Sequence, residues 1–356
     1  MKFGGFMYFQ NRGVDTTRVY DEHLAEIELM EALGFDEVWL AEHHFTYYGM
    51  LPSPNLLLAN LAARTKRLRM GAMILTLPFY EPIRLAEELT MLDHLSHGRL
   101  NVGIGSGVAR EFARRGLAVE DAKPRFFEAF DVLMKAFTQD RFDHDGQYWH
   151  YHDAPLEPKP LQQPYPPFYV AASSAETVRW CAERRLPIAQ MNSETTGVAQ
   201  AFAAYRAALA SANGGPALGT PSVRLFRPTY VAETTEQALA EAERAYFRFF
   251  QLFSADESPE YGTPTPENWR YHTGKALRRL GPHTFAEFDA DDYVIVGDPE
   301  RVAAKLQRLN QDLQLDTYVG NFAFGTLSHD QVSRSLRLFA QEVLPRLGAV
   351  PAATPA

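Results

Sequence analysis

The sequence predicts an α/β protein, a single (β/α)8 TIM barrel with a large insertion after the seventh strand. Short strand-forming runs alternate with longer stretches of helical periodicity along most of the 356 residues, a pattern typical of βα units around a parallel sheet. About eight such strands can be counted, which is the number that closes this barrel. One domain, residues 1–347, therefore accounts for the chain, and we expect the tail 348–356 to be disordered.

Periodicity and boundary residues place the elements of the first half. Within 17–33, apolar or aromatic side chains recur at a helical period from Tyr20 to Met30, and Gly34 ends the helix. Residues 140–167 contain prolines, aromatic residues and three histidines without a regular period, so we expect a loop. The elements predicted here are strands 2–9, 37–40, 69–75 and 100–104, and helices 17–33, 55–64, 83–95 and 125–137.

The second half continues the alternation and contains its one long interruption. Residues 254–293 are rich in proline and glycine. So long an irregular stretch inside a compact domain is commonly functional, and we expect a mobile lid over the barrel mouth. The elements predicted here are strands 168–172, 187–191, 223–232 and 317–324, and helices 175–185, 197–213, 235–253, 299–313 and 331–347.

Composition argues against several classes of protein. Hydrophobic residues make up 46% and charged residues 22% of the chain, which is ordinary for a globular protein. No apolar run approaches the roughly 20 residues that a bilayer requires, and the N-terminus lacks a signal-peptide pattern, so we expect a cytoplasmic protein that binds no membrane. The net charge of −9 disfavours nucleic-acid binding. Cys181 is the only cysteine, and a packed thiol is the expected state.

The strand 37–40 runs directly into Glu42, His43 and His44. A buried strand that ends in titratable side chains presents chemistry at the mouth of a barrel, and histidine exchanges protons near neutral pH. The plainer interpretation is that one histidine orients its neighbour and the other packs. Both interpretations place this triplet at the rim.

Three further histidines, His144, His150 and His152, lie in the expected loop. Their spacing matches no standard metal-ligand pattern. We therefore expect a solvated surface ribbon and no metal site.

A second candidate site follows the fifth strand, where Ser173, Ser174 and Thr177 open a helix. The first amides of a helix have no intrahelical partners, so a phosphate can rest there beside the hydroxyl groups. Simple capping of the helix by Ser174 explains the same residues equally well.

The chain resembles the bacterial luciferase-like flavin monooxygenases. The resemblance rests on the run from Trp39 to Phe45, on the N-terminal residues Met1 to Gly4 with Phe6, and on the run from Leu92 to Arg99. It extends from residue 1 to about residue 200 and returns in the last helix. The resemblance implies a barrel that binds FMN at its mouth.

Carried over residue by residue, the resemblance assigns the flavin contacts. Arg125, Ser174 and Thr177 match positions that hold the FMN phosphate, whereas a third phosphate contact of the family, an arginine, is replaced by Ser106. The peptide between Met73 and Ile74 stands where the family often has a cis bond under the flavin ring. The residues that match other positions around the ring are Phe6, Glu42, Val108 and Met191.

The activity that the resemblance implies is that of a two-component monooxygenase. A separate reductase would supply reduced FMN, which reacts with O₂ to a C4a-peroxyflavin that oxygenates a small organic substrate such as an aldehyde. His43 matches the catalytic histidine of the family, and Glu42 and His44 are placed to tune or orient it. The alternatives are a deazaflavin-dependent enzyme that transfers hydride, and a non-catalytic flavin-binding subunit.

The helices 55–64 and 83–95 carry more apolar surface than a solvent-facing layer needs. The resembling proteins pair through these helices. We therefore expect a homodimer.

Overall fold

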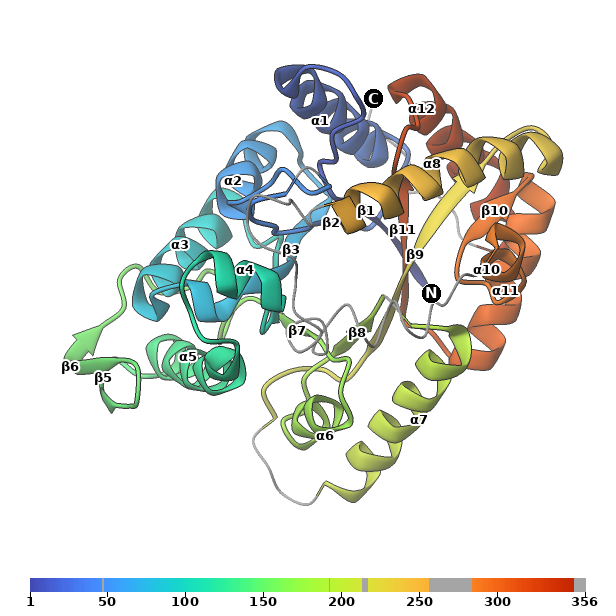
Figure 1. Ribbon diagram of the computed structural model, residues 1–356. Helices are drawn as coiled ribbons and strands as arrows, with labels where there is room; N and C mark the ends of the chain where they lie inside the picture. The colour runs from blue at the N-terminus through green and yellow to red at the C-terminus, as the bar shows by residue number, and fades with distance from the viewer. Residues whose placement is uncertain (47, 192, 213–216, 256–283, 349–356) are drawn as a thin grey trace.

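Eight parallel strands close into a barrel surrounded by helices (Figure 1) in the computed structural model, which describes residues 1–46, 48–191, 193–212, 217–255 and 284–348. The strand order is β1-β2-β3-β4-β7-β8-β9-β11, and β11 pairs with β1 to close the ring. The predicted TIM-barrel fold is confirmed. The barrel strands are β1 Lys2–Met7, β2 Glu37–Leu40, β3 Arg69–Thr76, β4 Leu100–Gly105, β7 Phe168–Ala171, β8 Ile188–Gln190, β9 Val223–Val231 and β11 Thr317–Ala323.

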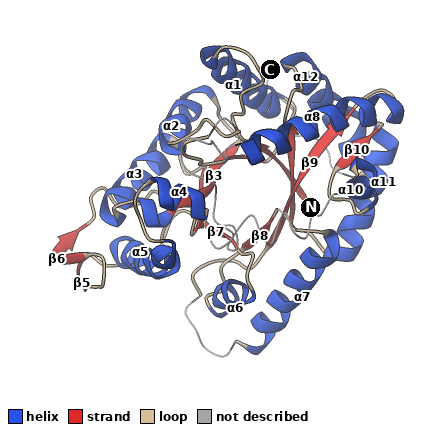
Figure 2. Cartoon of the chain, in the orientation of Figure 1, coloured by secondary structure: helices blue, strands red, loops and turns tan. Residues whose placement is uncertain are grey.

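Long helices cover the outside of the barrel, as the blue ribbons around the red strands show in Figure 2. Polar side chains cap several of them: Asp15 accepts hydrogen bonds from the first turn of α1, and Asp298 does so for α11. The helices are α1 Thr16–Ala32, α2 Pro54–Arg64, α3 Pro82–Leu95, α5 Ala122–Thr138, α6 Ala175–Glu183, α7 Thr195–Ser211, α8 Thr235–Ala255, α11 Pro299–Leu313 and α12 His329–Leu338, with shorter turns η1 Leu77–Phe79, α4 Ala109–Arg114 and η2 Val119–Asp121.

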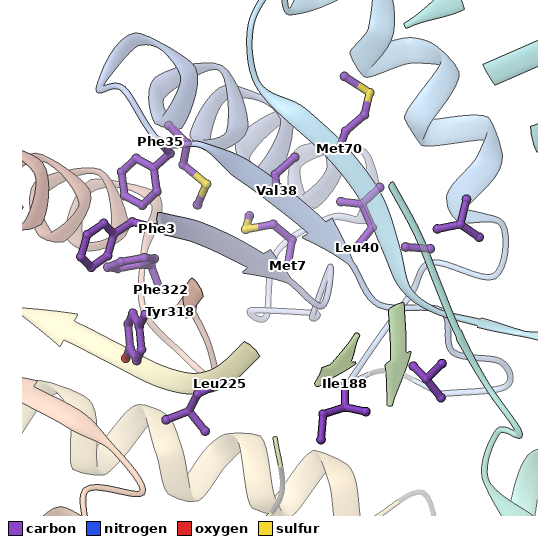
Figure 3. Close-up of a cluster of buried hydrophobic side chains, with 14 of the residues drawn as sticks. Phe3, Met7, Phe35, Val38, Leu40, Met70, Ile188, Leu225, Tyr318 and Phe322 are labelled. Carbon is purple, nitrogen blue, oxygen red and sulfur yellow. The ribbon is translucent and has the colours of Figure 1, made fainter. Parts of the chain in front are cut away.

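Alternation along the strands divides the apolar residues into two clusters. Phe3 and Met7 of β1 and Val38 of β2 belong to the main core, part of which Figure 3 shows. The intervening Phe6 and Trp39 belong to a second cluster. Since successive side chains of a strand point to opposite faces, the main core lies between strands and helices and the second cluster fills the barrel interior.

The segment 140–167 contains an antiparallel hairpin, β5 Arg141–Asp145 and β6 His150–Pro155 (Figure 2), so the expectation of a loop is wrong for these residues. Phe142 is the buried side chain of β5, which leaves no apolar alternation for a sequence pattern to reveal. The three histidines of this region each contact a carboxylate: His144 meets Glu128, His150 meets Asp145 and His152 meets Asp143.

The predicted insertion is described only at its ends, because residues 256–283 lie outside the described residues. Its last part is regular: α10, Phe285–Ala290, has a capping box between Thr284 and Glu287, and buries Phe285 and Phe288. The expectation of an irregular segment is therefore wrong here, since a Thr-x-x-Glu start is a helix signal. A short strand not predicted from the sequence, β10 Ile295–Gly297, then pairs with the end of β9.

The closing helix is also less regular than predicted. After α12 the chain forms a π-helical turn, Phe339–Val343, and then α13, Leu344–Arg346. Pro345 explains the change, because its ring excludes the usual backbone hydrogen bond of an α-helix. Across the described ranges, no helix is long and apolar enough to cross a bilayer.

Candidate active site at the barrel mouth

Glu42, His43 and His44 follow β2 at the carboxyl ends of the strands, as predicted. Glu42 and His44 are buried, and the His43 side chain is 17% exposed. The helix α8 reaches across the rim toward β1 (Figure 1), and its Phe249 ring lies 5.3 Å from the Tyr8 ring. His43 is thus the member of the triplet that opens most toward the mouth.

The His43 ring is held on three sides. Its Nδ1 lies 3.0 Å from Oε1 of Glu111, and the Tyr48 hydroxyl lies 3.0 Å from the same nitrogen and 3.3 Å from Nε2. The ring stacks almost parallel to Tyr8, at 5.9 Å between centroids. Arg110 donates a hydrogen bond of 2.5 Å to the Tyr48 hydroxyl. These contacts come from the loops after β1, β2 and β4, so the barrel itself sets the orientation of His43.

His44 belongs to a different network. Its Nε2 lies 3.1 Å from Oε1 of Glu42, and Tyr80 donates a hydrogen bond of 2.5 Å to the other oxygen of Glu42. Burial and the neighbouring Glu42 raise the pKa of Tyr80, so this hydroxyl remains a donor at neutral pH. The Arg115 guanidinium reaches within 3.1 Å of the His44 ring. His44 and Glu42 are therefore tied into the wall beneath the rim.

The barrel interior below His43 is apolar. Phe6 and Met73 belong to the cluster that fills it, and Ile74 and Met191 pack against that cluster. The peptide between Met73 and Ile74 is cis. Gly105 of β4 leaves room for the Ile74 side chain, since a Cβ there would come within 2.4 Å of it. Four residues predicted to surround a flavin ring thus share one apolar floor.

The residues predicted to hold the FMN phosphate lie at the starts of two helices, α6 and α5. Ser174 caps α6, its Oγ accepts from the Thr177 amide at 3.2 Å, and the two hydroxyls lie 2.8 Å apart. Ser173 beside them is exposed, and Ser106 and Val108 are half-buried in the loop after β4.

Arg125 lies on the first turn of α5, with its guanidinium 4.3 Å from the centre of the Tyr148 ring. It lines a cavity of about 380 Å³ together with Arg115 and Trp149. Its buried Nε has no hydrogen-bond partner among the described residues. Lys123, two residues earlier, pairs with Glu176 of α6 at 2.5 Å, which brings the starts of the two helices together.

These groups fit FMN. The orphaned Nε of Arg125 suits an anion, the hydroxyls of Ser174 and Thr177 stand at a helix N-terminus, and the apolar cluster offers a floor for a flat ring. The contacts found here that the sequence did not indicate come from Tyr8, Tyr48, Tyr80, Glu111 and Arg115. Glu111 and Arg115 were missed because the helix α4 was not predicted.

Residues 1–317 match the family model described as luciferase-like monooxygenase. Over 98% of both chains, the protein is 29% identical to the uncharacterised protein y4wF of Sinorhizobium fredii. It is 27% identical to the oxygenase component of the flavin-dependent trigonelline monooxygenase of Acinetobacter baylyi, covering 72% of this chain and 73% of the relative. An alkanal monooxygenase alpha chain from the Kryptophanaron alfredi symbiont is 33% identical over 53% of each chain.

Solved structures share the whole fold. Monooxygenase RslO1 from Streptomyces bottropensis superimposes with a TM-score of 0.83 at 24% identity, covering 98% of this chain and 100% of that one. An F420-dependent secondary alcohol dehydrogenase gives 0.73 at 15% identity, with 99% of each chain covered. At these identities the likeness shows the fold alone.

The closed barrel with a histidine and an apolar cluster at its mouth, together with the match to monooxygenases, makes the protein an oxidoreductase of the TIM-barrel class. The chain belongs to the luciferase-like monooxygenase family.

Proposed function

We propose that the protein is the oxygenase component of a two-component monooxygenase that uses reduced FMN and O₂. The observation that carries this is the shared apolar floor of Phe6, Met73, Ile74 and Met191, which meets His43 through the stacked ring of Tyr8. A flat aromatic ring placed there is shielded from water on one face and remains within reach of an acid/base group. The similarity to an oxygenase component supports the need for a separate reductase.

Three residues of the chain would bind the phosphate of FMN. Arg125 would pair with the phosphate, and Ser174 and Thr177 would hydrogen-bond it at the N-terminus of α6. Bound reduced FMN supplies the reaction with O₂, and the protein excludes water around it.

His43 then moves the proton that oxygenation requires, because its partly exposed imidazole lies at the barrel mouth. Glu42 and His44 support it from below: the hydrogen bonds from Tyr80 and His44 to Glu42 fix the loop from which His43 projects. Phe249 of α8 and Tyr8 narrow the space beside the ring, which favours a small and largely apolar substrate, such as an aldehyde.

The active form is a homodimer joined through α2 and α3. Leu56 on α2 is 76% exposed, and Met91 and Leu95 on α3 are each 53% exposed. Large apolar side chains gathered on two neighbouring helices are typical of a surface that a second copy covers.

The cofactor is tested by anaerobic fluorescence titration of the protein with reduced FMN and, separately, with a reduced deazaflavin. Tight binding of FMN alone is expected, and preferential binding of the deazaflavin would establish the hydride-transferring alternative. Oxygenated buffer and a panel of straight-chain alkanals are then added to the FMN complex. A complex that binds FMN but forms no oxygenated product from any substrate presented would favour the non-catalytic subunit.

The catalytic role of His43 is tested with H43A. This variant should bind reduced FMN nearly as the parent does, yet lose about 10²–10⁴-fold in oxygenation rate, the usual share of general acid/base catalysis. Parent-like oxygenation by H43A would mean that His43 is structural.

A further inference from the structure

The Glu111 carboxylate joins two loops of the barrel mouth. It lies on α4, after β4, and is 1% exposed. One of its oxygens, Oε1, lies 3.0 Å from Nδ1 of His43 and accepts a hydrogen bond of 3.3 Å from the backbone amide of His44. A single buried oxygen therefore contacts both histidines that follow β2.

Glu111 is ionised at neutral pH in spite of its burial. Burial opposes its ionisation, but the hydrogen bonds from His43 and the His44 amide, and the charge that either imidazole carries when protonated, outweigh that effect and hold the pKa of Glu111 below its ordinary value. An ionised carboxylate only accepts hydrogen bonds. The nitrogen of His43 that faces it must consequently carry a proton.

We infer that Glu111 is the positioning residue of His43: it keeps the neutral imidazole protonated at Nδ1 and leaves Nε2 as the atom that exchanges the proton. This rests on the proposed function of His43. The proton moves between Nε2 and the reacting group, and the Nδ1–H bond to Glu111 stays intact, as is usual where a carboxylate orients a histidine. Glu111 is 1% exposed and contacts His43, so it acts through His43 and is not itself presented to a substrate.

A purely structural role for Glu111 would be to satisfy the His44 amide. The variants E111Q and E111L separate the two roles. In E111Q the backbone amide of His44 can only donate, so the new side chain must present its oxygen there, and that same oxygen still accepts from Nδ1 of His43. E111L is of similar size but offers no acceptor.

The direct test is the tautomer of His43, measured by two-bond ¹H–¹⁵N correlation in protein labelled at its histidines, with H43A to assign the signal. The parent should show the Nδ1–H form, E111Q a majority of it, and E111L a shift toward Nε2–H. E42Q is the matched control, because Glu42 contacts His44 and not His43, so the His43 signal should not change. An unchanged His43 tautomer in E111L, or in E111A if E111L does not fold, overturns the inference, because neither side chain offers an acceptor.

A kinetic cycle adds a second readout. The rate at which O₂ reoxidises bound reduced FMN is measured for H43A, E111L and the double variant. The double variant should match H43A, since Glu111 acts through His43, and additive effects would overturn the inference. Parent-like reoxidation and oxygenation by H43A would instead refute the proposed role of His43, while the tautomer measurement still decides what Glu111 does to the ring.

Discussion

Replacing Arg125 with alanine should weaken FMN binding about tenfold to a hundredfold while leaving turnover at saturating flavin close to that of the parent. The structure places Arg125 on the first turn of α5, with a buried Nε that has no partner among the described residues. An unpartnered buried donor gains a full hydrogen bond when an anion arrives. Removing it removes that gain from the bound state alone.

The size of the effect follows from the kind of contact. A hydrogen bond between charged groups contributes about 1.5–3 kcal/mol, and each 1.4 kcal/mol is about tenfold in affinity. The guanidinium also lies over the Tyr148 ring, which adds roughly 0.5–1 kcal/mol to the stability of the free protein. R125A should accordingly lower the melting temperature slightly without unfolding the protein.

Anaerobic titration of reduced FMN, followed by fluorescence, measures the dissociation constant. K123A is the matched control, because Lys123 lies two residues away on the same helix and pairs with Glu176 across an exposed surface, where an ion pair contributes about 0–1 kcal/mol. R125K should fall between parent and R125A, since it keeps the charge but not the planar fork. If R125A binds FMN within threefold of the parent, the phosphate does not rest on Arg125.

Three further results are expected. L56E combined with M91E should convert the proposed dimer to a 40.2 kDa monomer in sedimentation experiments, because both side chains are exposed on the helices proposed to pair; a dimeric double variant contradicts the proposed surface. His329 donates to the buried Glu26, which raises the pKa of His329 above 6.5. That stabilisation is complete below pH about 6.5 and lost as pH rises through the folded pKa, so H329Q should lower the melting temperature more at acid than at alkaline pH, and an equal loss at both would contradict the assignment. G325A should destabilise the fold by well over about 1 kcal/mol in urea unfolding, since its Cβ would meet the Ala245 carbonyl, whereas G116A, also at positive φ but with open space around it, should cost much less.

The barrel could be predicted because its strands and helices differ in length and period. The run Glu37–Leu40 is too short for a helix and lies between the polar residues Asp36 and Glu42. It forms a fully buried strand that pairs with β1 on one side and β3 on the other. The hairpin β5–β6 and the short helix α4 could not be predicted in the same way. The hairpin buries almost none of its side chains, and α4 is only 6 residues long, so neither shows a readable hydrophobic period.

The candidate site likewise contains residues that could be predicted from the sequence and residues that could not. His43 and Ser174 stand beside strand ends and a helix start, which sequence patterns mark. Glu111 contacts His43 from 68 positions away, and Tyr80 reaches Glu42 from 38 positions away. Such pairs form only when the barrel closes and brings the loops after β2, β3 and β4 together, so no local sequence pattern predicts them.

Ser106 bears on the proposed FMN site, because it stands where the family has a third phosphate-binding arginine. Three arginines follow it on and after α4, but each is used elsewhere: Arg110 donates to the Tyr48 hydroxyl, Arg114 to the Phe45 carbonyl, and Arg115 contacts the His44 ring. All three hold the loop that carries the histidines. The charges of these arginines therefore support the position of His43, so under the proposed function the FMN phosphate would depend on Arg125 with the hydroxyls of α6. Loss of Arg125 should accordingly fall at the upper end of the tenfold to hundredfold range, because Arg115, the other cation that lines the cavity among the described residues, already contacts the His44 ring.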